Sequence, residues 1–139
     1  MANVPSTDFG DNFYDTLATE AGVFIYDDTH PGGAIVHVFG EATFADTQAL
    51  ESIIVSATHI NRPIAIDMRE CTYMDCATIG VLVRAAKNLG DLLRLVIPRH
   101  SQGHRLLDLT GLTRVLHIFE SLDGAFAPLV ERLPYLRSV

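Results

Sequence analysis

The sequence has 139 residues, 48 % of them hydrophobic, and a formal net charge of −7 at pH 7, which predicts one globular domain with a single core. The acidic balance argues against nonspecific binding to nucleic acid or to an anionic membrane, because both depend on clustered Lys and Arg. No apolar run approaches the roughly 20 residues that a membrane-spanning helix needs, so no membrane insertion is expected. The N-terminal stretch lacks the basic and apolar regions of a signal peptide, which favours a cytoplasmic location.

The charges are unevenly distributed along the chain. Residues 1–61 contain nine of the 17 acidic residues and no Lys or Arg, whereas residues 62–139 contain all ten basic residues. Such an acidic half could steer a basic partner at low ionic strength, or it could only keep the protein soluble. The sequence leaves both interpretations open.

The N-terminal half predicts a loose arm, a hairpin and a helix. Residues 1–20 are polar and weakly patterned, which is typical of a loose arm. Two runs rich in β-branched and aromatic residues, 23–26 and 34–40, flank a Pro-Gly-Gly turn and predict a hairpin. Over 44–59 the period becomes helical, and the expected buried stripe consists of Leu50, Ile53, Ile54 and Ala57.

The C-terminal half alternates strands with helices. Strands are expected at 63–68, 92–98 and 115–119, a loop at 69–73, and helices from Asp75 to a left-handed cap at Gly90, at 101–111 and at 121–133. This alternation requires right-handed crossovers and a mostly parallel sheet. The predicted class is therefore α/β, with element order ββαβαβαβα, a mixed sheet of four to five strands and helices mainly on one face. We expect an arm at 1–20, one domain at 21–133 and a tail at 134–139.

The segment YMDCATIG, residues 73–80, lies at a predicted strand-to-helix junction. Asp75 precedes the apolar helical stripe and can accept hydrogen bonds from the free amides of the first turn. Thr78 could face solvent at the carboxyl end of the sheet, where open α/β folds usually place their sites. Capping alone explains Asp75 as well as a function does, whereas the location of the segment favours a function.

Catalytic and cofactor chemistry has weak support in the sequence. Cys76 at a helix N-terminus could be a nucleophile with a lowered pKa, but no His is close to it in sequence. Cys71 and Cys76 do not have the paired spacing of a zinc site, and one pair is too few for a disulfide framework. No glycine-rich nucleotide motif occurs. We therefore predict free thiols, no catalytic residue, no metal and no cofactor.

Two runs of sequence resemble the STAS domain of bacterial anti-sigma factor antagonists: IAIDMRECTYMDCATIGVLVRA at 64–85 and LLRLVIPRHSQGHRLLDLTGLTRVLHIFESLDGAF at 92–126. The common features are a strand ending in Asp67, a Tyr-Met-Asp before a small-residue helix start, and a Leu-Asp-Leu-Thr-Gly-Leu segment before the last strand. A Gly-Glu pair at 40–41 fits as well. The resemblance covers about residues 21–131 and implies a single STAS-like domain.

The resemblance also implies a partner-switching role in transcription regulation. In that family the helix start reads roughly Asp-Ser-Ser-Gly-Leu-Gly, and a partner kinase phosphorylates the second serine. Before phosphorylation, the protein binds a serine-kinase anti-sigma factor and thereby releases the sigma factor. Phosphorylation reverses this binding. Physically, a phosphate adds about −1.5 to −2 charges to the docking surface.

This sequence departs from the family pattern at the phosphoacceptor. Ala77 aligns with the acceptor serine, Cys76 with the first serine and Thr78 with the glycine. Thr78 could take the phosphate, the domain could bind its partner without this control, or it could serve another STAS role. We favour the last two interpretations over phosphorylation of Thr78.

A docking surface is therefore expected at the 69–75 loop and the first turns of the following helix. Its candidate residues are Tyr73, Asp75, Cys76, Ala77, Thr78 and Gly80. The expected partner is a kinase-type anti-sigma factor, and a homodimer formed through the 1–20 arm stays open. The alternatives are an accessory STAS subunit of a membrane lipid-transport ATPase and a Cys76-dependent enzyme.

Overall fold

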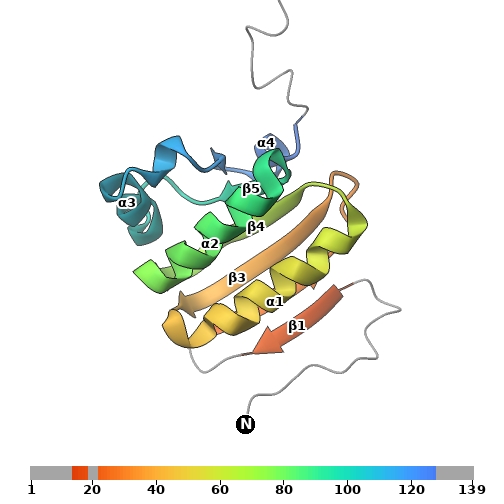
Figure 1. Cartoon of the computed structure of the whole chain (residues 1–139), viewed down its shortest axis with the longest axis horizontal. Coiled ribbons are helices and arrows are strands. Elements are labelled where there is room, and N and C mark those ends of the chain that lie inside the picture. Colours follow the sequence, from red (N-terminus) through yellow and green to blue (C-terminus); the bar gives the residue numbers. More distant parts are fainter. Residues whose placement is uncertain (1–13, 19–21, 128–139) are drawn as a thin grey trace, which may run out of the picture.

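The computed structural model describes residues 14–18 and 22–127. Its strands form one six-stranded sheet in sequential order: β1 (Tyr14–Ala18), β2 (Gly22–Asp27), β3 (Ala34–Ala42), β4 (Ile64–Met74), β5 (Leu93–Val96) and β6 (Ile118–Phe119). Strands β1, β3, β4 and β5 are labelled in Figure 1. The first two strand pairs are antiparallel and the other three are parallel. The predicted mixed, mostly parallel α/β sheet and its hairpin are confirmed, but the sheet has six strands where four to five were expected, because β1 adds an edge strand.

The helices lie mainly on one face of this sheet, as predicted. They are α1 (Thr47–Ala57), α2 (Cys76–Leu89), α3 (Gln102–Leu109) and the short α4 (Leu122–Ala125), with 3-10 turns η2 (Phe44–Asp46), η3 (Thr58–Ile60), η4 (Gly90–Leu92) and η5 (Leu112–Arg114). Side chains of the first three helices share one buried cluster with the sheet, whereas α4 contributes to a second cluster on the opposite face.

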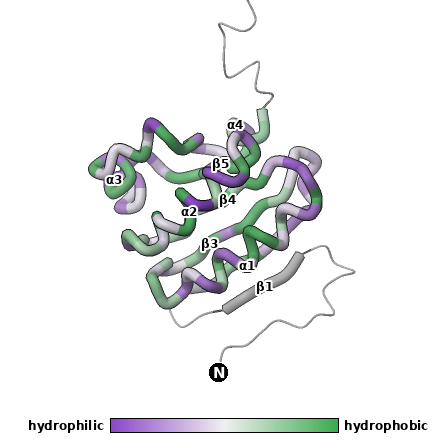
Figure 2. Tube along the Cα trace, viewed as in Figure 1, coloured by the Kyte–Doolittle hydropathy of each residue, from purple (hydrophilic) through white to green (hydrophobic). Residues whose placement is uncertain are grey.

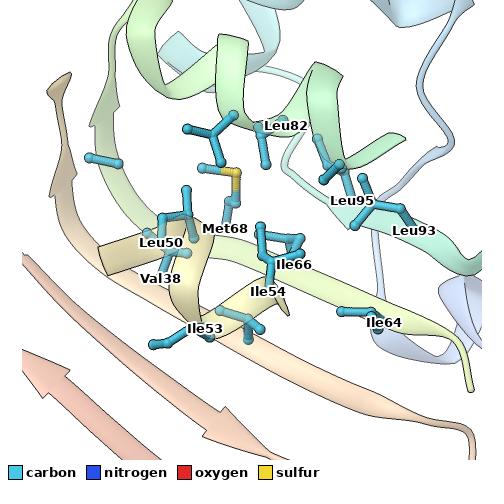
Figure 3. Close-up of a cluster of buried hydrophobic side chains, with 14 of the residues drawn as sticks. Val38, Leu50, Ile53, Ile54, Ile64, Ile66, Met68, Leu82, Leu93 and Leu95 are labelled. Atoms are coloured by element: carbon cyan, nitrogen blue, oxygen red, sulfur yellow. The ribbon is translucent and has the colours of Figure 1, made fainter. Parts of the chain in front are cut away.

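The main core lies between the sheet and helices α1 and α2. Alternate residues of β3, β4 and β5 face the core, and in Figure 2 these strands appear largely hydrophobic. Figure 3 shows them meeting the predicted stripe of α1 and Leu82 of α2; its labelled residues are Val38, Leu50, Ile53, Ile54, Ile64, Ile66, Met68, Leu82, Leu93 and Leu95. Each fully buried aliphatic side chain contributes about 1.5–3 kcal/mol relative to exposure.

Strand β4 is longer than predicted, and this correction bears on the site. The expected loop 69–73 is part of the strand, which runs on to Met74. It stays extended because, beyond register shifts after His37 and after Gly40, it pairs with the end of β3 as far as Ala42. The exposed polar residues of this segment suggested a loop, yet its backbone groups are used in the sheet.

The two ends of the domain differ from the sequence prediction as well. Residues 14–18 form edge strand β1, in a segment where a loose arm was expected. The strand expected at 115–119 is reduced to Ile118–Phe119, because η5 and a turn precede it. Helix α4 ends at Ala125, and the rest of the helix expected at 121–133, like the 134–139 tail, lies largely outside the described residues.

Candidate docking site

Asp75 joins the end of β4 to the start of α2 and connects both to the preceding turn. One carboxylate oxygen accepts a hydrogen bond from the Thr78 amide at 3.0 Å, as the predicted helix cap requires. The other accepts from the Phe44 amide at 2.8 Å, and the Asp75 amide donates to the Ala42 carbonyl at 3.2 Å. Although partial burial raises the pKa of Asp75, these hydrogen bonds hold it below its usual range. Asp75 is therefore an ionised cap shared by two helical segments.

Thr78 does not face solvent, contrary to the sequence expectation. Its side chain is 1 % exposed. Its hydroxyl oxygen lies 2.8 Å from the Ala42 carbonyl oxygen and 3.1 Å from an Asp75 carboxylate oxygen. The hydroxyl is thus a structural group that ties the first turn of α2 to the end of β3.

The remaining candidate residues lie at the surface of the same junction. Cys76 and Ala77 are exposed in the first turn of α2, and Tyr73 just before it is 44 % exposed. Gly80 is half-buried, and a Cβ added there would meet only an Arg84 guanidinium nitrogen, at 3.6 Å. Packing within the described chain therefore does not require a glycine at this position.

Two residues that sequence reasoning missed complete the junction. The Gln102 side chain, at the start of α3, accepts a hydrogen bond from the Met74 amide at 2.8 Å and donates to the Met74 carbonyl at 2.9 Å. Phe44, in the turn between β3 and α1, is 73 % exposed beside Asp75. Gln102 carries no recognisable signal because its partner is 28 positions away, whereas Phe44 was assigned to the helical pattern without regard to its exposure.

A second polar cluster lies on the other face of the sheet, around Asp67. This carboxylate is 5 % exposed; one oxygen lies 2.8 Å from His37 Nδ1, and the Arg69 guanidinium donates to both oxygens at 2.9 Å. Burial raises the pKa of Asp67, but the hydrogen bonds from His37 and Arg69 outweigh it and hold the pKa well below its usual range. The cluster is an internally satisfied structural unit.

The cysteines are free thiols, as predicted. Cys71 is half-buried, its Sγ donates to the Tyr73 carbonyl at 3.3 Å, and burial raises the pKa of its thiol. Among the hydrogen bonds of the described residues, none joins the exposed Cys76 thiol to a histidine. No group of three or more metal-ligating side chains in residues 14–18 and 22–127 could hold a metal ion. No helix of the described part is long and apolar enough to cross a membrane.

These features define an α/β domain with an exposed helix start, capped by Asp75, at the carboxyl end of its central parallel strand. The model of the STAS domain family matches residues 25–125. The chain belongs to the STAS domain family, and the resemblance seen in the sequence is confirmed.

Solved structures share this fold along nearly their whole length. An anti-sigma factor antagonist from Mycobacterium paratuberculosis is 24 % identical, covers 86 % of this chain and 97 % of its own, and has a TM-score of 0.68. A putative anti-sigma factor antagonist from Thermotoga maritima is 19 % identical, covers 82 % of this chain and 94 % of its own, and has a TM-score of 0.58. The phosphorylated form of the Bacillus cell fate determinant SpoIIAA is 15 % identical, covers 82 % of this chain and 99 % of its own, and has a TM-score of 0.51. None of the curated proteins matches the chain.

Proposed function

We propose that this chain is a bacterial, cytoplasmic regulatory domain of the anti-sigma factor antagonist type, and that it docks a kinase-type anti-sigma factor through the first turn of α2. Membership in the STAS family supports the class. The observation that carries the docking site is the exposed pair Cys76–Ala77 on a helix start held rigid by Asp75. A rigid, exposed turn suits protein recognition because little conformational entropy is lost on binding.

The proposal also holds that the first turn of α2 lacks the phosphorylation site through which the family controls docking. Ala77 occupies the position that carries the acceptor serine in the family, and a methyl group cannot be phosphorylated. The nearest hydroxyl, that of Thr78, is buried and bonded to main-chain and carboxylate oxygens. A kinase could reach it only after the first turn of α2 had opened. Docking through this turn is therefore not controlled by phosphorylation of the turn itself.

The two alternatives make different predictions about the partner. An accessory STAS subunit of a lipid-transport ATPase would bind an ATPase subunit through the same domain. A Cys76-dependent enzyme would need a base beside the thiol. The hydrogen bonds among the described residues supply no such base for Cys76, so the docking role is the better supported one.

Titration of the purified chain with each kinase-type anti-sigma factor of the organism that encodes it tests the proposal. We expect one of them to bind, and the substitution Ala77→Arg to weaken that binding at least tenfold. Asn88→Arg is a matched control, because Asn88 is exposed near the opposite end of the same helix. If Ala77→Arg and Asn88→Arg change the affinity by the same factor, the proposed surface is excluded. If the chain binds only an ATPase subunit, the accessory-subunit role is favoured.

A further inference from the structure

Phe44 is a large aromatic side chain that the fold leaves in solvent at the docking site. It is 73 % exposed, although its backbone amide is bonded to the Asp75 carboxylate that caps α2. The turn η2 that carries Phe44 also contacts α2. In Figure 1 η2 and the start of α2 lie at the same end of the sheet. Single exposed apolar residues are common on protein surfaces, so the position of Phe44 matters more than its exposure.

The turn that presents Phe44 is held by several hydrogen bonds. The buried Asp46 carboxylate accepts from the Thr43 amide at 2.9 Å, and the Asp46 amide donates to the Thr43 carbonyl at 2.8 Å. On the other side of the turn, the Thr47 hydroxyl donates to the Phe44 carbonyl at 3.0 Å. Together with Asp75, these bonds fix the backbone on both sides of the aromatic ring. The side chain is therefore presented from a preorganised backbone, which lowers the cost of burying it against a partner.

The charged groups beside Phe44 are acidic. Glu41 is exposed three positions before it, and the ionised Asp75 carboxylate lies against its amide. Two basic side chains on the flanking elements are paired with other acids: Arg69 is bonded to Asp67, and Arg84 pairs with Glu51 at 3.2 Å. A complementary partner surface would thus combine an apolar pocket with basic residues around it.

We propose that Phe44 is the aromatic anchor of the docking surface and that it enters an apolar pocket with a basic rim on the partner. This inference rests on the proposed function, and it extends the interface from α2 to the β3–α1 turn. Aromatic residues that enter a desolvated pocket carry a large share of binding energy in protein interfaces. Phe44 would bury its ring there, while Glu41 faces the basic rim.

The test compares three substitutions in titrations with the anti-sigma factor that binds the unmodified chain. Phe44→Ala is expected to lower affinity about 30-fold, the size of a typical hot-spot loss. Leu109→Ala is the matched control, because Leu109 is 78 % exposed at the end of α3, and its effect should stay within about twofold. Glu41→Lys should weaken binding at low salt and have less effect at high salt.

The outcomes separate the inference from the proposed function. If Ala77→Arg abolishes binding while Phe44→Ala leaves affinity unchanged, the docking site stands and the anchor is excluded. If no anti-sigma factor binds, a photoreactive benzoylphenylalanine placed at position 44 or 77 and irradiated in cells decides the matter. Crosslinks from both positions to one protein, at a peptide with apolar and basic residues, would support the anchor. Crosslinks from 77 alone, or from neither position, would overturn it.

Discussion

The hydroxyl oxygen of Thr78 lies 2.8 Å from the carbonyl oxygen of Ala42, so the first turn of α2 is tied to the end of β3. The two residues are 36 positions apart in the sequence. Ala42 is the last residue of β3, and Thr78 lies in α2, the helix that follows the neighbouring parallel strand β4. The same carbonyl accepts from the Asp75 amide. The Asp75 carboxylate in turn caps the turn that carries Phe44. Thr78 therefore stabilises the backbone of the docking site from the buried side of α2. Its hydroxyl is unavailable as a modification site while the first turn of α2 is intact.

Replacing Thr78 by Val should destabilise the domain by about 1 kcal/mol, the usual net value of one hydrogen bond. The loss stays at this level because the Ala42 carbonyl keeps its bond from the Asp75 amide. Urea unfolding followed by circular dichroism measures the change. Thr72→Val is the control, since Thr72 is exposed on β4, and it should alter stability by less than about 0.5 kcal/mol. Equal effects at the two positions would contradict the structural role of the Thr78 hydroxyl.

The substitution Ala77→Ser should create a phosphorylation site. The new hydroxyl would be exposed in the first turn of α2, one residue before the buried Thr78. Incubation with the partner kinase and ATP should add one phosphate to the variant and none to the unmodified chain. Intact-mass spectrometry followed by fragmentation identifies the modified residue. Phosphate on Thr78 of the unmodified chain would show that the first turn opens readily and would restore the phosphorylation hypothesis.

Periodicity was sufficient to predict the core and the order of elements from β2 onward. The stripe of Leu50, Ile53 and Ile54 is buried as expected, because an amphipathic helix has one low-energy way to face a sheet. The length of β4 and the presence of β1 escaped prediction because strand pairing depends on partners distant in sequence. Local patterns of polarity do not contain this information.

The candidate site was predicted in part. The cap at Asp75 has a local signal, namely an acid before a helical stripe, and it was found. The burial of Thr78 depends on where Ala42 lies in space, and the Gln102–Met74 bonds join elements that periodicity treats separately. Hydroxyl and amide side chains of this kind look like solvent-facing residues in a sequence until the fold supplies their buried partners.

The substitution Asp67→Asn should destabilise the domain at pH 7 by about 2–3 kcal/mol, because it removes a buried carboxylate bonded to Arg69 and His37. The pKa of Asp67 in the folded state is below its unfolded value of about 4, so protonation favours unfolding. The stabilisation is therefore fully present above about pH 4 and is lost as the pH falls toward the folded-state pKa. Accordingly, the stability difference between the unmodified chain and the variant should shrink below pH 4.

Urea titrations at a series of pH values from 7 to 3 measure this difference. His37→Ala provides a milder companion variant that retains the Asp67–Arg69 pair, so the test survives if Asp67→Asn does not fold. A stability difference between the unmodified chain and Asp67→Asn that stays constant across the series would mean that Asp67 is not the ionised centre of the cluster.

The substitution Gly80→Ala should separate stability from docking. Gly80 lies inside α2, and an added Cβ has ordinary space, with its nearest neighbour at 3.6 Å. Alanine should therefore stabilise the domain by about 0.5–1 kcal/mol, the difference in helix propensity. The added methyl group would nevertheless lie on the docking surface, one helical turn after Cys76, and would obstruct the partner there. The affinity for the partner should therefore fall. Gly103→Ala is the contrasting control, because its Cβ would lie 2.9 Å from Met74 Cε and 3.0 Å from Ile97 Cδ1, both buried, so it should stabilise the domain less than Gly80→Ala does. If Gly80→Ala raises stability and leaves affinity unchanged, Gly80 lies outside the contact area, and the docking surface must be redrawn around Phe44, Cys76 and Ala77.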